Sequence, residues 1–172
     1  LQLSATETSV SATWTALDVA DWNDAALEYR VVLARLESEF SASGAEVLET
    51  TTIAGTSITF DGLEEYVDYE GTVTPINTVF TAFEDRGDDL SALGAQAQKR
   101  TEAAVPADSP TIDDTSISMT AHTITLSWSV LPKPDFNGPP RRYVVQYRGL
   151  AFDYVENGNT AATADEIPTA AD

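Results

Sequence analysis

The sequence SVSATWTAL, at residues 9–17, alternates apolar and hydroxyl-bearing side chains almost one by one. Its apolar members Val10, Ala12, Trp14 and Ala16 share one face when the segment is extended. Such a period of two is typical of a strand with one buried and one solvated face. The content of Thr, Val and aromatic residues favours a strand as well. The stretch therefore predicts antiparallel β structure.

The same pattern is repeated once, 114 residues later, so that Trp128 corresponds to Trp14. Five residues of the first copy recur with identical spacing: Trp14, Asp21, Asn23, Tyr29 and Val31 correspond to Trp128, Asp135, Asn137, Tyr143 and Val145. Self-similarity over the length of a small domain indicates two copies of one module in series. Such a tandem is more typical of a spacer or a binding array than of an enzyme.

Alternating segments separated by turn residues continue along the chain. In the first copy we expect strands at 1–5, 9–17, 27–36, 45–53, 56–61, 68–79 and 93–101. In the second copy we expect them at 111–119, 122–130 and 141–149, with a further candidate at 152–156. Residues 25–40 also resemble a helix, but Gly138-Pro139-Pro140 in the repeat favours a strand. Seven short strands predict an all-β sandwich.

The repeat also predicts the domain boundaries. Residues 1–103 form the first module, 104–110 a linker stiffened by Pro106 and Pro110, and 111–172 a partial second module. A full second copy would run to about residue 215, because the first ends near residue 101. Either the sequence is a piece of a longer protein, or a partner chain supplies the missing strands. We expect the segment after about residue 156 to be irregular, or ordered only on another chain.

Composition limits the classes of partner. The chain has 28 acidic and 9 basic residues, a net charge of −19, and no cysteine. Nucleic acid and anionic membrane surfaces are poor partners because both require a basic face. Disulfides and cysteine-based metal sites are excluded. An acidic, soluble surface suits an extracellular or cell-surface chain.

Several residues follow one another in a characteristic order. Trp14, Tyr29, Leu63, Tyr69 and Asn77 stand at spacings that resemble the fibronectin type III family, and Trp128 and Tyr143 repeat the first part of the pattern. The resemblance implies tandem immunoglobulin-like sandwiches. It also implies a core that contains Trp14, Tyr29, Leu63, Tyr69, Trp128 and Tyr143, together with Ile58, Phe60 and Val73. The Tyr69 hydroxyl is then expected to bond the backbone near residues 63–65.

Two residues depart from the family pattern. Gly71 and Pro75 occupy inward positions of the 68–79 strand where Val and Ala are usual. Because proline has no N–H to donate within a sheet, we expect a bulge or an early strand end near Pro75.

One short motif has a recognised chemistry. Arg86-Gly87-Asp88 falls in the loop before the 93–101 strand, where integrin-binding members of the family present the same tripeptide. There the Asp completes the coordination of a divalent cation on the integrin, and the Arg meets an acidic groove. The alternative is an ordinary acidic turn.

The other candidate sites favour structural interpretations. The segments at 21–24 and 135–138 contain Asp and Asn, but they lack a full calcium loop and are typical of turns. His122 is the only histidine and has no second ligand nearby in sequence. We therefore expect no catalytic, cofactor or metal site.

These features predict a non-catalytic module of a longer surface or secreted protein, serving as a spacer, adhesion or assembly element. Its partners would be other protein chains, bound by strand addition to the incomplete second module, with no insertion into a membrane. Two alternatives remain open: an accessory module of a secreted microbial enzyme, and a subunit of an extracellular filament completed by neighbouring chains.

Overall fold

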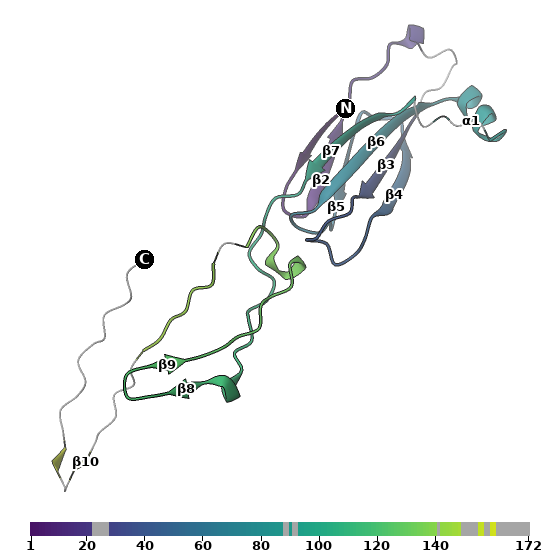
Figure 1. Cartoon of the computed structure of the whole chain (residues 1–172). Coiled ribbons are helices and arrows are strands. Elements are labelled where there is room, and N and C mark those ends of the chain that lie inside the picture. The colour runs from purple at the N-terminus through teal and green to yellow at the C-terminus, as the bar shows by residue number, and fades with distance from the viewer. Residues whose placement is uncertain are drawn as a thin grey trace. The chain divides into compact units, whose positions relative to one another are not determined.

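The structure, a computed structural model, describes residues 1–21, 28–87, 90, 93–140, 142–148, 155–156 and 159–160 (Figure 1). The chain forms two compact units, Leu1–Pro140 and Arg141–Asp172, and each is described by itself. The predicted boundaries at 103 and 111 remain a prediction.

The N-terminal part of the first unit consists of two antiparallel sheets. Its elements are β1 (Gln2–Ala5), β2 (Ser9–Thr13), η1 (Val19–Asp21), β3 (Glu28–Arg35), β4 (Glu46–Ile53), β5 (Ser57–Asp61), β6 (Asp68–Ile76), α1 (Thr78–Glu84) and β7 (Ala95–Arg100). One sheet has the order β1-β2-β5 and the other β4-β3-β6-β7. The two sheets pack face to face, which confirms the expected all-β sandwich.

All seven expected strands of the first copy are present within the expected ranges, and β2 and β6 end well before the expected residues 17 and 79. β2 ends at Thr13, which pairs with Ser57, the first residue of β5. β6 ends at Ile76, so the early end expected near Pro75 is confirmed, although Pro75 itself still pairs with Tyr29. The bulge lies elsewhere, between Leu33 and Ala34 on the β4 side of β3.

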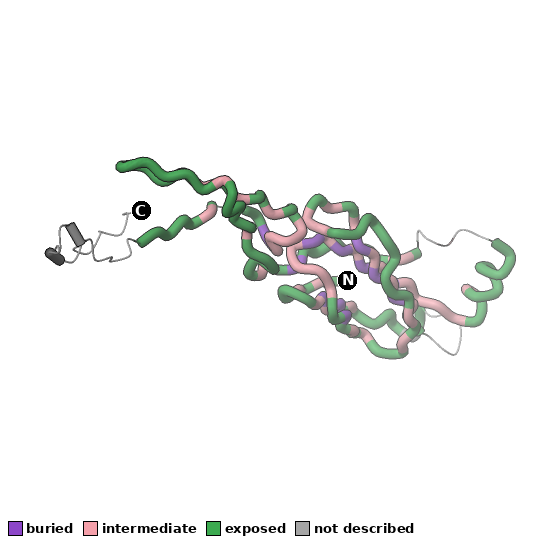
Figure 2. The backbone as a smooth tube through the Cα atoms, turned by 90° about the horizontal axis from the view of Figure 1, so that it is seen from below, coloured by how far each residue is buried: buried purple, intermediate pink, exposed green. Residues whose placement is uncertain are grey.

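The core lies between the two sheets (Figure 2). β3 alternates strictly, with every second residue buried from Tyr29 to Arg35. The buried cluster is Val10, Tyr29, Val31, Leu33, Phe60, Val67, Tyr69 and Val73. Inward side chains from both sheets thus form one apolar layer, as period-two patterning requires.

Three residues expected in this core are only half-buried at its margin: Trp14, Ile58 and Leu63. Trp14 follows the last paired residue of β2 and therefore packs at the rim of the sandwich. Its ring meets Tyr29 edge-on, with centroids 5.4 Å apart. Trp14 thus covers the core, whereas we had expected it to fill the core.

The corner before β6 has the expected geometry. The Glu64 N–H donates to the Tyr69 hydroxyl at 2.9 Å, and Tyr69 is fully buried. Thr101, just after β7, ties the same corner, because its hydroxyl donates to the Glu64 carbonyl at 2.7 Å and accepts from the Val67 N–H at 3.0 Å. Burial raises the pKa of Tyr69 above its ordinary value, because the phenolate would lose its hydration.

Replacing Tyr69 with phenylalanine should lower the free energy of unfolding by about 1 kcal/mol, the typical net contribution of one hydrogen bond. The raised pKa adds a pH dependence. Above a pH of about 10 the unfolded tyrosine ionises first, so the wild type loses stability as pH rises and its advantage over the variant shrinks. Urea unfolding at neutral and alkaline pH measures both effects. A constant difference across this range would contradict the assignment.

The second copy is much less regular. In the first unit it contains η3 (Asp114–Ser116), the paired strands β8 (Ser118–Met119) and β9 (Ile124–Thr125), an isolated bridge from Ile112 to Trp128, and η4 (Pro134–Phe136). The strands expected at 111–119 and 122–130 are thus mostly irregular. Trp128 is half-buried rather than buried.

In the second unit, β10 (Val155–Glu156) pairs with β11 (Asn159–Thr160). The prediction of a strand at 141–149 is wrong for the described part, 142–148, which contains no strand. Tyr143 in this segment is half-buried. In the first copy, by contrast, the equivalent strand β3 lies between β4 and β6 and is paired on both edges. Most of 157–172 lies outside the described residues, and the tandem organisation stays a prediction.

Candidate binding surface at the α1 end of the sandwich

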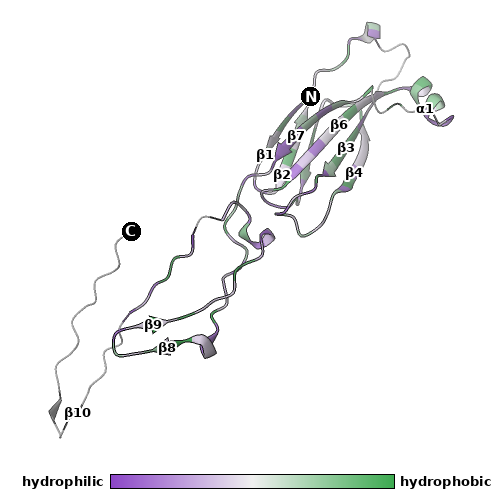
Figure 3. Cartoon of the chain, in the orientation of Figure 1, coloured by the Kyte–Doolittle hydropathy of each residue, from purple (hydrophilic) through white to green (hydrophobic). Residues whose placement is uncertain are grey.

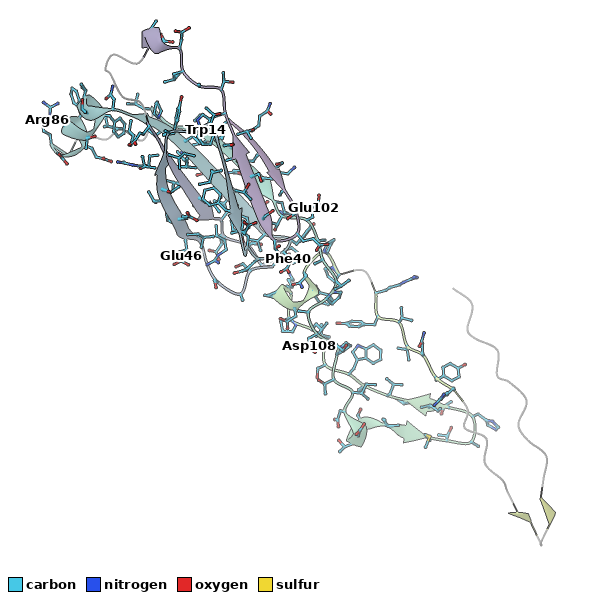
Figure 4. All side chains as sticks on the ribbon, turned by 180° about the vertical axis from the view of Figure 1, so that it is seen from behind. Trp14, Phe40, Glu46, Arg86, Glu102 and Asp108 are labelled. Atoms are coloured by element: carbon cyan, nitrogen blue, oxygen red, sulfur yellow. The ribbon has the colours of Figure 1, made fainter. Side chains whose placement is uncertain are left out.

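Two connections meet at one end of the sandwich. The β2–β3 connection contains η1, and the β6–β7 connection contains α1 (Figure 1). Because β3 begins and β6 ends there in an antiparallel pair, both connections share that end. Arg86 and Trp14 lie towards it, whereas Phe40, Glu46 and Glu102 lie towards the other (Figure 4).

α1 was not expected, because we had predicted a strand up to residue 79. Asn77 caps the helix: its side-chain oxygen accepts from the Phe80 N–H at 2.8 Å, and its carbonyl accepts from the Thr81 hydroxyl at 3.0 Å. An asparagine followed by a polar residue and an apolar pair is a helix start signal that the strand interpretation passed over. The helix buries none of its residues.

Arg30 of β3 holds α1 against the sheet. Its guanidinium forms a two-pronged ion pair with Glu84, with one Nη2–Oε2 distance of 2.8 Å, and lies 5.6 Å from the centre of the Phe80 ring. The hydrogen bonds from Arg30 lower the pKa of Glu84, and the same contact raises the pKa of Arg30. Sequence reasoning missed this pair because the two residues are 54 positions apart.

A small pocket opens beside the cap. It is lined by Glu28, Ile76, Asn77, Thr78 and Thr81 and has a volume of about 150 Å³. Pockets for drug-sized ligands are typically about 300–1,000 Å³. This end of the sandwich is therefore better suited to contact with a protein surface than to enclosing a small molecule.

The residues of the Arg-Gly-Asp motif follow α1. The Arg86 guanidinium lies over the Phe83 ring at 4.1 Å, and Gly87 adopts φ +85°, a left-handed conformation that favours glycine. Asp88 lies outside the described residues. Val79 and Phe83 are exposed on one helical face beside Arg86, and we call these three residues the α1 surface. A protein that bound the Arg86 guanidinium would have to displace the contact between Arg86 and the Phe83 ring.

The remaining candidates lie in turns. Asp135 and Phe136 belong to η4, and Asn137 ends it in the left-handed conformation at φ 49°. Asp21 ends η1, and His122 lies exposed between β8 and β9. Trp22, Asn23 and Asp24 lie outside the described residues. Within the described ranges, no three His, Asp or Glu side chains are grouped to hold a metal ion, and no helix is long and apolar enough to cross a membrane.

Comparison with known proteins adds no assignment: no protein-family model matches the chain, and no curated protein matches it.

Proposed function

We propose that this chain is a non-catalytic, extracellular pair of fibronectin type III-like modules, the second incomplete, within a longer surface or secreted protein. The observation that carries the proposal is the pair of sheets in the orders β1-β2-β5 and β4-β3-β6-β7, joined by the Tyr69 corner. This arrangement supports the resemblance noted from the sequence. Modules of this kind act as spacers, adhesion elements or assembly elements.

Exposed apolar side chains of the second copy favour assembly with other protein chains. Met119, Ile124 and Val130 in the first unit are well exposed, as are Val145 and Tyr147 in the second. Figure 3, which colours the ribbon by hydropathy, shows green, apolar positions at β8 and β9. In the first copy, the equivalents of Ile124 and Val145 are Val10 and Val31, which are fully buried. Strand addition by a partner would bury the same positions in the second copy and pair their backbone.

The α1 surface is the proposed site for adhesion. It combines two exposed apolar side chains, Val79 and Phe83, with the Arg86 cation at the tip of a connection. Binding sites are often placed on connections held by a rigid sheet. If the partner is an integrin, Asp88 would complete the coordination of its divalent cation.

The sequence that flanks this module in the full protein would distinguish its possible roles. A row of similar modules beside this chain would favour a spacer, and a neighbouring catalytic domain would favour an accessory module of a secreted microbial enzyme. The exposed apolar positions of the second copy also suit a filament subunit that neighbouring chains complete.

Assembly between copies is tested with a pair of matched lysine variants. Ile124→Lys charges β9 at a side chain that is 59% exposed, and Val47→Lys charges β4 of the complete sandwich at one that is 60% exposed. We expect the wild type to associate as its concentration rises in sedimentation experiments. Ile124→Lys should abolish the association, because a buried charge opposes strand addition, whereas Val47→Lys should preserve it. A chain that stays monomeric, or equal effects of both variants, would leave only the spacer and adhesion roles.

A further inference from the structure

The linker between the two copies contacts the loop that follows β9. The Ala104 N–H donates to the Asn137 carbonyl at 2.9 Å, and the Ala107 N–H donates to the Asp135 carbonyl at 2.9 Å. The Asn137 side-chain amide returns a bond to the Val105 carbonyl at 3.0 Å. Backbone groups of a linker are ordinarily satisfied by water. Three bonds in four residues therefore form a defined docking contact.

Two residues of the loop give it the shape that this contact needs. Asn137 adopts the left-handed conformation at φ 49°, which asparagine tolerates better than most residues, and this turns its carbonyl and amide towards the linker. Gly138 is buried, and a Cβ there would lie 2.9 Å from the Cβ of Ala103. Any larger residue at 138 would thus push the linker away.

A charge contact reinforces the same junction. The Lys133 ammonium, at the start of the loop, pairs with the Glu39 carboxylate between β3 and β4. Both side chains are more than half exposed, so solvent screens the pair and its own contribution to stability is small. The pair instead favours the arrangement in which the loop contacts the linker over arrangements in which the two are apart.

At two of the three equivalent positions the first copy has a different residue. Lys133 corresponds to Val19 and Gly138 to Asp24, whereas Asn137 corresponds to Asn23. The turn asparagine is therefore common to both loops, but the cation and the glycine belong to the second copy alone. Of the three residues that shape this contact, Lys133 and Gly138 therefore distinguish the second copy from the first, whereas the asparagine does not.

We propose that residues 133–138 form a latch that binds residues 103–107 of the same chain, where the first module passes into the linker. The latch makes the segment after β7 a structured junction, in which the loop of the second copy holds the chain that leaves the first. It depends on Gly138 for space, on Asn137 for the backbone turn and a hydrogen bond, and on Lys133 for orientation. The inference needs only the repeat and these contacts, so it is independent of the proposed function.

The test is amide hydrogen exchange on the full chain, followed residue by residue by NMR. Gly138→Ala should speed exchange at Ala104 and Ala107 by about fivefold or more, since each loses a hydrogen bond. Gly55→Ala is the matched control, because a Cβ there meets nothing within 4 Å, and it should leave both amides unchanged. Thr101, whose N–H bonds the Val67 carbonyl inside the sandwich, serves as the internal reference.

Three further variants test the asparagine bond and the charge contact. Asn137→Asp retains the side-chain shape but cannot donate to the Val105 carbonyl, so exchange at Ala104 should rise while Thr101 stays protected. Lys133→Glu should speed linker exchange slightly, and adding Glu39→Lys should restore it. Unprotected Ala104 and Ala107 amides in the wild type, or the same exchange in Gly138→Ala and Gly55→Ala, would overturn the latch.

Discussion

Replacing Tyr69 with alanine should lower the free energy of unfolding of the first sandwich by about 3–5 kcal/mol, the range of large aromatic truncations. The ring is fully buried among side chains of both sheets, and its hydroxyl accepts the Glu64 N–H. The variant therefore leaves a cavity and also an unsatisfied backbone donor. Urea unfolding, followed by the fluorescence of Trp14 beside the core, measures the loss.

Tyr147 provides the matched control for this truncation. Its side chain is 63% exposed, so Tyr147→Ala should change the free energy of unfolding by less than about 0.5 kcal/mol, as for most surface substitutions. A cost for Tyr69→Ala no larger than that for Tyr69→Phe would show that the ring does not fill the core.

The second large effect is expected at Arg35, the last residue of β3. The residue is 7% exposed. Its guanidinium lies 2.9 Å from the Glu64 carboxylate and 3.0 Å from that of Glu46, and it donates to the Gly44 carbonyl at 2.9 Å. Arg35→Ala removes a cation that ties β3 to β4 and to the Tyr69 corner. We expect a loss of about 3 kcal/mol in urea unfolding, the lower end for breaking a buried pair, because both carboxylates remain hydrated.

Arg100, the last residue of β7, is the matched arginine. It pairs with Asp68 and lies over the Tyr66 ring, but its side chain is 46% exposed. Solvent screens such pairs, so Arg100→Ala should cost no more than about 1 kcal/mol. Equal losses for Arg35→Ala and Arg100→Ala would contradict the view that burial makes Arg35 the stronger tie.

The first sandwich was predictable because its signals are local. Alternation of apolar residues along β3 reflects burial of one strand face, and the Leu63–Tyr69 spacing indicates the corner. α1 was missed because its stability comes partly from Arg30, which is distant in sequence. Sequence periodicity reports which face is buried, but it cannot report a helix held by one side chain from another element.

The second copy shows the opposite limit. The pattern around Trp128 and Tyr143 is as clear as that around Trp14 and Tyr29, yet the described residues of the second copy form only short strands. A strand is stable only when neighbouring strands pair with its edges and an apolar layer covers its face. The sequence pattern indicates which residues would be buried, but it does not provide the neighbouring strands or the apolar layer. Arg86 and the turn at 135–138 were candidates from the sequence, but the contacts that define the α1 surface and the latch come from the structure.

The balance of charges also determines the electrostatic field around the molecule. Four of the nine cationic residues, Arg30, Arg35, Arg100 and Lys133, are engaged with carboxylates in the described part of the chain. The net charge is −19 whether or not these groups are paired, so the excess of acidic groups dominates the far field. Two copies should therefore repel each other over roughly 10 Å at 0.1 M ionic strength, and over longer distances in dilute buffer. Repulsion between copies is therefore expected to weaken as ionic strength rises, so any contact between them should form more readily in salt.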